Sequence, residues 1–193
     1  MKPMDQSLSE AQSSKTKIIW LIVMMLFVIG LLVLLGLELF SRDGKAPSMG
    51  QRPPDFSLQS FSGEIIDTAS LRGKIVLINF WSSWCTTCDE EAVMLEEVWS
   101  AVESEGDVVF LGVAYMDTEP DSLDFMETYG VTYLNGPDLR GEISRLYQVS
   151  SVPETYVLDA TGVLRVVKIG PFTSTEEIFT AIENTASPSV GNR

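Results

Sequence analysis

The two cysteines of the chain, Cys85 and Cys88, stand where a buried strand is predicted to give way to a helix. The preceding run, residues 75–80, is short, mostly apolar and rich in β-branched residues, which predicts a central strand covered on both faces. From Cys88 to about residue 105, apolar residues recur at helical spacing. Two thiols this close together, at a strand-to-helix junction, constrain the fold and the chemistry more than any other stretch.

A helix start favours a negatively charged sulfur, because its first turn carries unpaired backbone N–H groups and the positive end of the helix dipole. We expect Cys85 to be the reactive thiol. Cys88, three residues later and inside the helix, is expected to be the less exposed, resolving thiol. The pair is a candidate redox-active Cys85–Cys88 disulfide, which needs no cofactor and no metal.

Three other interpretations of the cysteines compete with this one. A purely structural disulfide closing so small a ring would remove little chain entropy. A zinc half-site lacks partners, because the sequence has no third cysteine and no histidine. Two inert buried cysteines would not explain the flanking tryptophans or the placement before a helix. A Cys-x-x-Cys pair beside a strand–helix unit is typical of redox proteins.

An uncharged apolar run, residues 18–37, precedes this region. Twenty helical residues span about the 30 Å of a bilayer core, so we expect a transmembrane helix over residues 18–39 that contacts the lipid bilayer. A cleaved signal peptide is the alternative, but no small-residue cleavage site follows. Lys15 and Lys17 abut the run, whereas Glu38 and Asp43 dilute the positive charge beyond it, which favours a cytoplasmic N-terminus.

The predicted membrane span divides the rest of the chain into segments on either side of the membrane. The expected divisions are a cytoplasmic N-terminal stub at 1–17, the span at 18–39, a linker at 40–54, a folded domain at 55–185 and a flexible tail at 186–193. The cysteines would then lie in an extracytoplasmic domain of a single-pass protein of the cell membrane. A dithiol in an oxidising compartment needs an electron donor, which we expect in the same membrane.

The pattern of the domain predicts an α/β fold. A β-hairpin is expected from residues 56–58 and 64–67, a second buried strand at 108–115, and a helix with Pro120 in its first turn that runs through Tyr129. Residues 135–138 are predicted to turn, and 141–147 to form a short helix. Two strands at 154–159 and 163–169, joined by a turn at 160–162, precede a last helix at 175–185 with Ser174 as its cap. Strand–helix–strand order predicts a parallel pair.

The acidic balance narrows the range of partners. From residue 46 onward the chain has 8 Lys and Arg against 23 Asp and Glu, a net charge of −15. Such a surface repels nucleic acid and anionic lipid, so neither is an expected ligand beyond the anchor itself.

The run from Phe80 to Cys88, together with Val152-Pro153 farther along, resembles the thioredoxin fold. Within that superfamily, residues 53–183 resemble the membrane-anchored TlpA/ResA/CcmG (DsbE) group, which are thiol–disulfide reductases of cytochrome c maturation. The features shared with this group are the N-terminal anchor, Asn79 where thioredoxin has a buried aspartate, Glu91, the segment 112–117, and Val152-Pro153-Glu154-Thr155. The resemblance implies a thioredoxin fold, with a central mixed β-sheet flanked by helices, preceded by the N-terminal β-hairpin.

The resemblance also implies site residues. Pro153 would be cis and lie beside the disulfide, where it, Val152, Glu154 and Trp84 would contact the substrate. An ordinary loop proline is the plain alternative. Glu91 would be a partly buried carboxylate that disfavours the thiolate and moves a proton to or from the cysteines. Its plain alternative is a first-turn glutamate that answers the helix dipole, a role that Asp89 and Glu90 could equally fill.

The direction of electron transfer can be predicted from the charged side chains near the two cysteines. The residues between the cysteines, Thr86 and Thr87, are neutral, and the neighbours Asp89, Glu90 and Glu91 are acidic. Negative charge disfavours a thiolate and weakens the reduced state, which favours a reductant.

The resemblance implies that the substrate is the haem-attachment disulfide of an apocytochrome c, and the donor a membrane thiol–disulfide transporter. Two alternatives stay open: a general extracytoplasmic disulfide reductase, and a tethered binding module with a static disulfide. A peroxiredoxin is disfavoured, because its Pro-x-x-x-Thr-x-x-Cys pattern precedes neither cysteine.

Overall fold

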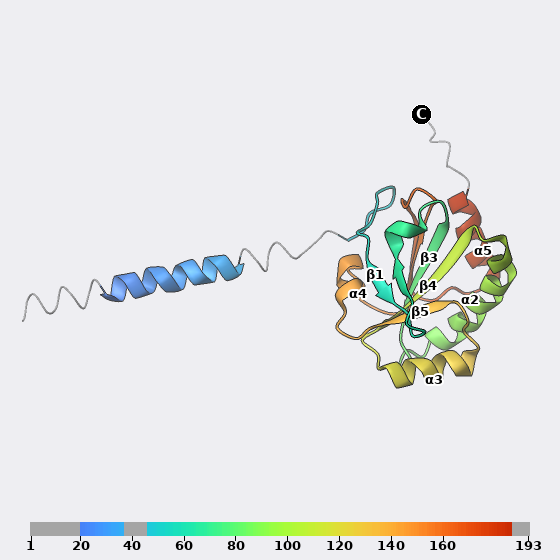
Figure 1. The fold of residues 1–193 in the computed structure, drawn as a ribbon, viewed down its shortest axis with the longest axis horizontal. Helices are drawn as coiled ribbons and strands as arrows, with labels where there is room; N and C mark the ends of the chain where they lie inside the picture. The colour runs from blue at the N-terminus through green and yellow to red at the C-terminus, as the bar shows by residue number, and fades with distance from the viewer. Residues whose placement is uncertain (1–19, 37–45, 187–193) are drawn as a thin grey trace, which may run out of the picture. The chain divides into compact units, whose positions relative to one another are not determined.

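The structure is a computed structural model that describes residues 20–36 and 46–186. The chain divides into two units, residues 1–44 and 45–193. In the first unit, residues 20–36 form a helix (Figure 1). No helix within the described ranges is long enough and apolar enough to cross a membrane. Parts of four predicted segments lie outside the described residues: the stub at 1–17, the span ends at 18–19 and 37–39, the linker at 40–45 and the tail at 187–193.

The second unit is built on a five-stranded mixed sheet with the strand order β5-β4-β3-β6-β7. Its strands are β3 (Ile75–Trp81), β4 (Val108–Tyr115), β5 (Leu134–Asp138), β6 (Glu154–Leu158) and β7 (Leu164–Ile169). β3, β4 and β5 run parallel, whereas β6 is antiparallel to both β3 and β7. Every residue of β3 is buried, which confirms the predicted central strand.

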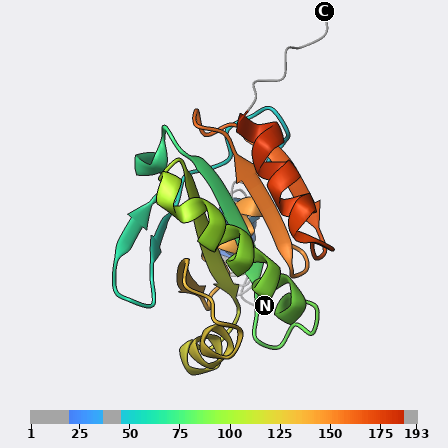
Figure 2. The same cartoon turned by 90° about the vertical axis from the view of Figure 1, so that its right-hand side faces the viewer.

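The helices cover both faces of this sheet (Figure 1). They are α2 (Cys88–Val102), α3 (Glu119–Tyr129), α4 (Glu142–Tyr147) and α5 (Thr175–Ala186). α2 and α5 pack against each other, side by side over one face (Figure 2). Apolar side chains of both helices, such as Leu95 and Ile178, are fully buried in the core on this face. The predicted parallel pair β3–α2–β4 is confirmed.

The predicted hairpin is also confirmed, and it packs on the opposite face. β1 (Ser57–Gln59) and β2 (Ile65–Asp67) pair antiparallel. Leu58 of β1 is 1% exposed and belongs to a second apolar core, shared with Ile143 and Tyr147 of α4. The sheet is therefore enclosed between two hydrophobic layers, as the resemblance implies.

The prediction of a turn at residues 135–138 was wrong, because these residues form the edge strand β5. Pro137 is tolerated there, since an edge strand pairs on one side only and does not need every N–H. Gly136 is required by the hairpin, because a Cβ at this position would lie 2.4 Å from the backbone oxygen of Gln59. The edge is capped by a bond from Phe61 N to Asn135 O, at 2.9 Å.

The helix starts follow the sequence signals. Thr118 caps α3, its hydroxyl accepting from Asp121 N, and Pro120 lies in the first turn as predicted. The backbone N–H of Glu177 donates to Ser174 Oγ at 3.3 Å, which confirms Ser174 as the cap of α5. The N-cap position of α4 is Gly141, and the Asp138 carboxylate at the end of β5 accepts from three backbone N–H groups of the first turn.

The described part of the segment predicted as a linker, residues 46–54, is bonded to the domain. Gly50 N donates to Leu164 O at 2.8 Å, and Leu164 N donates to Gln51 O at 2.9 Å. Pro53 is buried. The chain is thus attached to the start of β7 before the hairpin begins.

Candidate active site

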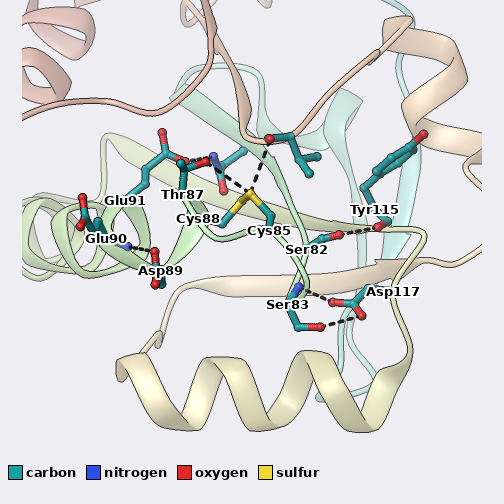
Figure 3. The surroundings of a disulfide bond; sticks show 12 residues. Ser82, Ser83, Cys85, Thr87, Cys88, Asp89, Glu90, Glu91, Tyr115 and Asp117 are labelled. Carbon is teal, nitrogen blue, oxygen red and sulfur yellow. Dashed lines mark hydrogen bonds between the residues drawn. A yellow bond between two sulfur atoms is a disulfide. The ribbon is translucent and has the colours of Figure 1, made fainter.

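The two cysteines lie between the end of β3 and the start of α2 and form a disulfide (Figure 3). β3 ends at Trp81, and Cys88 is the first residue of α2. Cys85 is 8% exposed and Cys88 is 2% exposed, the order expected for an attacking and a resolving thiol. Both cysteines stand at the start of α2, the positive end of the helix dipole, which stabilises an anion.

The loop before Cys85 is held by β4 and the residues that follow it. Ser82 Oγ donates to Tyr115 O at 2.8 Å. The backbone N–H and the hydroxyl of Ser83 donate to the two carboxylate oxygens of Asp117, at 2.7 and 2.9 Å (Figure 3). Asp117 is only 3% exposed. These bonds fix the direction in which the loop presents Cys85.

The loop before β6 lies directly against the disulfide. The peptide bond between Val152 and Pro153 is cis, which confirms the conformation implied by the resemblance. The carbonyl oxygen of Val152 lies 3.5 Å from Cys85 Sγ, and the hydroxyl of Thr87 lies 3.6 Å from the same sulfur. Pro153 is buried and Val152 is half-buried. Residues 67 positions apart in the sequence therefore meet at the attacking sulfur.

Glu91 is fully enclosed one helical turn after Cys88, on the same face of α2. Its side chain is 1% exposed, whereas Glu90 is exposed to solvent. Asn79 Nδ2 donates to one carboxylate oxygen at 3.0 Å, and Phe172 N donates to the other at 2.9 Å. The plain role of answering the helix dipole does not require such burial.

Burial raises the pKa of Glu91 from 4.5 to about 7, because desolvation disfavours the carboxylate. The bonds from Phe172 and Asn79 and the charge of Lys168 lower the pKa but do not offset the desolvation. The pKa of Glu91 therefore lies near neutral pH, in a residue one helical turn after Cys88.

The remaining predicted residues lie on either side of this cluster. Trp84 is 57% exposed, and its ring centre lies 6.4 Å from that of Tyr115. Glu154 follows Pro153 but is buried, and its carboxylate accepts from the Tyr156 hydroxyl. Tyr156 belongs to the core beneath the hairpin, so this carboxylate lies on the face of the sheet opposite to Glu91.

Several residues of the site were not singled out as site residues from the sequence. Thr155 Oγ1 accepts from Asn79 Nδ2 at 2.9 Å, which orients the amide toward Glu91. Phe172 contributes only its backbone N–H, for which no side-chain signal exists. Asp117 carries a weak signal, as a polar residue just after a predicted buried strand.

Comparisons with known proteins agree with this geometry. Residues 49–167 match the family model described as the AhpC/TSA family. The "Thioredoxin-like protein YneN" of Bacillus subtilis is 33% identical over 72% of this chain and 82% of its own length. The "Thiol:disulfide interchange protein DsbE" of Allochromatium vinosum is 31% identical over 72% of this chain and 77% of its own. The "Thiol-disulfide oxidoreductase ResA" of Bacillus subtilis is 30% identical over 73% and 77%, respectively.

Among solved structures, that of a putative DsbE from Chlorobium tepidum superposes with a TM-score of 0.67. The match covers 72% of this chain and 99% of that one at 20% sequence identity. At this identity the likeness concerns the fold, which is thioredoxin-like.

Proposed function

This chain belongs to the AhpC/TSA family, and from that premise we propose that it reduces protein disulfides through Cys85 and Cys88. It is a thiol-disulfide oxidoreductase of the DsbE and ResA type. The observation that carries the proposal is the position of the disulfide, at the start of α2 and in contact with the carbonyl of Val152. That carbonyl marks where an incoming chain would meet Cys85.

The reaction transfers two electrons from the protein to its substrate. The Cys85 thiolate attacks one sulfur of the substrate disulfide, which forms a mixed disulfide and releases the other substrate sulfur as a thiolate. The Cys88 thiolate then attacks Cys85 Sγ, forms the Cys85–Cys88 disulfide and releases the second substrate thiolate. The substrate is reduced and the protein is oxidised.

Glu91 is the proposed base for the second step. Cys88 is 2% exposed, so its thiol has little contact with water that could take the proton. A carboxylate with a pKa of about 7 lies one turn away and is ionised in a large share of molecules at neutral pH. In the reverse direction the same group would return the proton when a donor reduces the disulfide.

The acidic surroundings support a reductant. The first turn of α2 carries Asp89, Glu90 and Glu91, and no basic side chain. These carboxylates disfavour a thiolate and so weaken the reduced state relative to the disulfide.

Trapping of the mixed disulfide tests the exchange mechanism. In a Cys88→Ser variant the second step is blocked, so incubation with an oxidised protein substrate should give a covalent complex through Cys85 that dithiothreitol releases. The matched control is Cys85→Ser, which keeps one thiol but places it at the buried position. If Cys88→Ser traps no more complex than Cys85→Ser, the disulfide is static and the binding-module alternative takes its place.

We further propose that residues 18–39 anchor the domain in the cell membrane, with the N-terminus in the cytoplasm and the cysteines outside. The uncharged run at 18–37 supports this, because its twenty residues match the thickness of a bilayer core when helical. The electron donor would then be a thiol–disulfide transporter in the same membrane. Protease added to intact spheroplasts should remove the domain while a cytoplasmic marker survives; a protected domain would refute this topology.

The substrate that we propose is the haem-attachment disulfide of an apocytochrome c. Support comes from the resemblance to reductases of cytochrome c maturation, and the Cys-x-x-Cys-His sequence gives a direct probe. The reduced protein should reduce an oxidised peptide with this sequence faster than a cystine peptide of the same length without the histidine. Equal rates would favour the general disulfide reductase.

A further inference from the structure

The segment between β7 and α5 supplies one of the hydrogen bonds that hold Glu91. Phe172 N donates to one carboxylate oxygen of Glu91 at 2.9 Å, and Phe172 itself is buried, at 3% exposed. Two residues earlier, Gly170 N donates to Pro153 O at 3.0 Å, which ties the segment to the loop that contains the cis proline. A shift of this segment would therefore change the hydrogen bond that reaches Glu91.

An ion pair holds the other end of the same segment. The Glu177 carboxylate, in the first turn of α5, accepts from the backbone N–H and the hydroxyl of Thr173, at 3.0 and 3.1 Å. The ammonium group of Lys168, on β7, is ion-paired with the other oxygen of that carboxylate. The pair thus joins the strand to the helix, and Phe172 lies between its two members along the chain.

The register of the sheet places Lys168 beside the residues that surround Glu91. Lys168 pairs with Thr155 of β6, so the two side chains lie on the same face of the sheet. Thr155 Oγ1 accepts from the Asn79 amide, and the same amide donates to Glu91. The Lys168 Nζ also lies 5.6 Å from the centre of the Phe172 ring, a distance at which a cation is attracted by the ring. Lys168 therefore contacts the residue whose backbone holds Glu91.

The charged and titratable groups that act on Glu91 come from several elements. Burial has the largest effect on the pKa of Glu91 and raises it to about 7. The charge of Lys168 on β7 lowers that pKa, and the charge of Glu177 on α5 raises it. Tyr133, directly before β5, stays uncharged, because burial, followed by the charge of Glu91, raises its pKa. On α2, Cys88 is held in the disulfide. Lys168 and Glu177 thus act on Glu91 in opposite directions.

We propose that Lys168 and Glu177 are positioning residues, which set the fraction of Glu91 that is ionised through their charges and through the segment that they hold. The proposal rests on the proposed function, in which ionised Glu91 takes the proton of Cys88. Lys168 increases the supply of this base, and its ion pair with Glu177 keeps the increase partial. Both residues act through Glu91 and take no part in the exchange of disulfides.

Neutral replacements of similar length separate the effect of charge from that of the segment's position. Lys168→Met removes the positive charge, so the midpoint of Glu91 ionisation should move to higher pH, by about half a pH unit. Glu177→Gln removes the negative charge but keeps an oxygen that can accept from Thr173, so the midpoint should move to lower pH. Lys168→Arg should keep the wild-type midpoint. Disorder of the segment would act differently, because loss of the Phe172 N–H bond raises the midpoint in either variant.

Carbon-13 NMR of the full-length oxidised protein, labelled at the carboxyl carbon of the glutamate side chains, measures the midpoint directly. The signal of Glu91 is the one that Glu91→Gln lacks. Arg165→Met is the matched control, because Arg165 lies on the same strand and is also ion-paired, but with Asp159, directly after β6. This variant should titrate as the wild type does.

The same variants connect the midpoint to the reaction. At pH 6, which lies below the midpoint, a rise of half a pH unit leaves about threefold less Glu91 ionised. Reduced Lys168→Met should therefore reduce an oxidised protein substrate about threefold more slowly than the wild type at this pH. Arg165→Met should react at the wild-type rate.

Two results would overturn the positioning role while leaving the proposed function intact. One is that the NMR midpoint stays unchanged in both Lys168→Met and Glu177→Gln. The other is that the midpoint rises in both variants, which would show that the pair serves only to stabilise the segment. If the wild-type protein reduces no protein disulfide, the proposed function falls, and the NMR midpoints still decide whether the pair controls the ionisation of Glu91.

Discussion

Replacing Glu91 by glutamine should change how the stability of the oxidised protein depends on pH. In the folded protein Glu91 holds its proton up to about pH 7, whereas in the unfolded chain it loses it near the ordinary pKa of 4.5. Because the pKa is higher in the folded state, the stabilisation that protonated Glu91 contributes is fully present below pH 4.5 and is lost as the pH rises to 7. Above that pH the carboxyl is ionised in both states, and no further loss is expected.

The magnitude follows from the two pKa values. A rise from 4.5 to about 7 corresponds to about 3 kcal/mol in total, of which about 2.5 kcal/mol should be lost between pH 5 and pH 8. Between pH 5 and pH 8 no histidine or cysteine side chain adds to the pH dependence, because the chain has no histidine and cysteines in a disulfide do not titrate. The depressed pKa of Asp159, about 2, acts only at lower pH.

Urea unfolding of the oxidised protein, followed by tryptophan fluorescence at pH 5, 6, 7 and 8, would measure this slope. The free energy of unfolding of the wild type should fall by about 2.5 kcal/mol more than that of Glu91→Gln across the range. Glu90→Gln is the control, since Glu90 lies in the same helical turn but is exposed, and it should follow the wild type. Parallel curves for the wild type and Glu91→Gln would refute protonation of Glu91 near neutral pH.

Two further substitutions test the arrangement around the cysteines. Thr87→Val removes a hydroxyl that lies 3.6 Å from Cys85 Sγ. Because the anionic sulfur loses a hydrogen-bond donor, alkylation of the reduced protein by iodoacetamide at pH 7 should slow about fivefold. An unchanged alkylation rate would show that the hydroxyl does not stabilise the sulfur. Gly112→Ala would place a Cβ 1.5 Å from Asn135 Oδ1, the atom that accepts from Trp81 Nε1 at 2.7 Å. The clash and the disturbed hydrogen bond should lower the free energy of unfolding by about 3 kcal/mol, measured by urea titration. A loss below about 0.5 kcal/mol would contradict that packing.

Most of the fold could be predicted from local pattern. The apolar run of β3 and the helical spacing after Cys88 are strong signals because both elements are buried along their length or along one face. β5 escaped prediction because Gly136 and Pro137 are the residues that normally mark turns. Their presence in a strand depends on the hairpin packed over Gly136 and on the edge position of Pro137, both of which are tertiary facts.

The site residues likewise fall into those that the sequence could predict and those that depend on tertiary packing. The cysteine pair is a local motif, and Pro153 was found through the resemblance to a known family. The environment of Glu91 could not be predicted from the sequence, because its hydrogen-bond partners Asn79 and Phe172 are 12 and 81 positions away along the chain. Its burial, and hence its raised pKa, depends on how α2 packs against α5 and the sheet. The direction of the Glu154 side chain was equally hidden, since one position along a strand decides which face it occupies.

The reduction potential of the Cys85–Cys88 couple tests the central claim most directly. Equilibration of the purified protein with glutathione or dithiothreitol redox buffers, with the reduced fraction counted by thiol alkylation, would give the value. A reductase with this acidic helix start should lie at or below about −180 mV, toward the value of about −270 mV for thioredoxin. A potential near about −120 mV, that of a strong oxidant, would contradict the account.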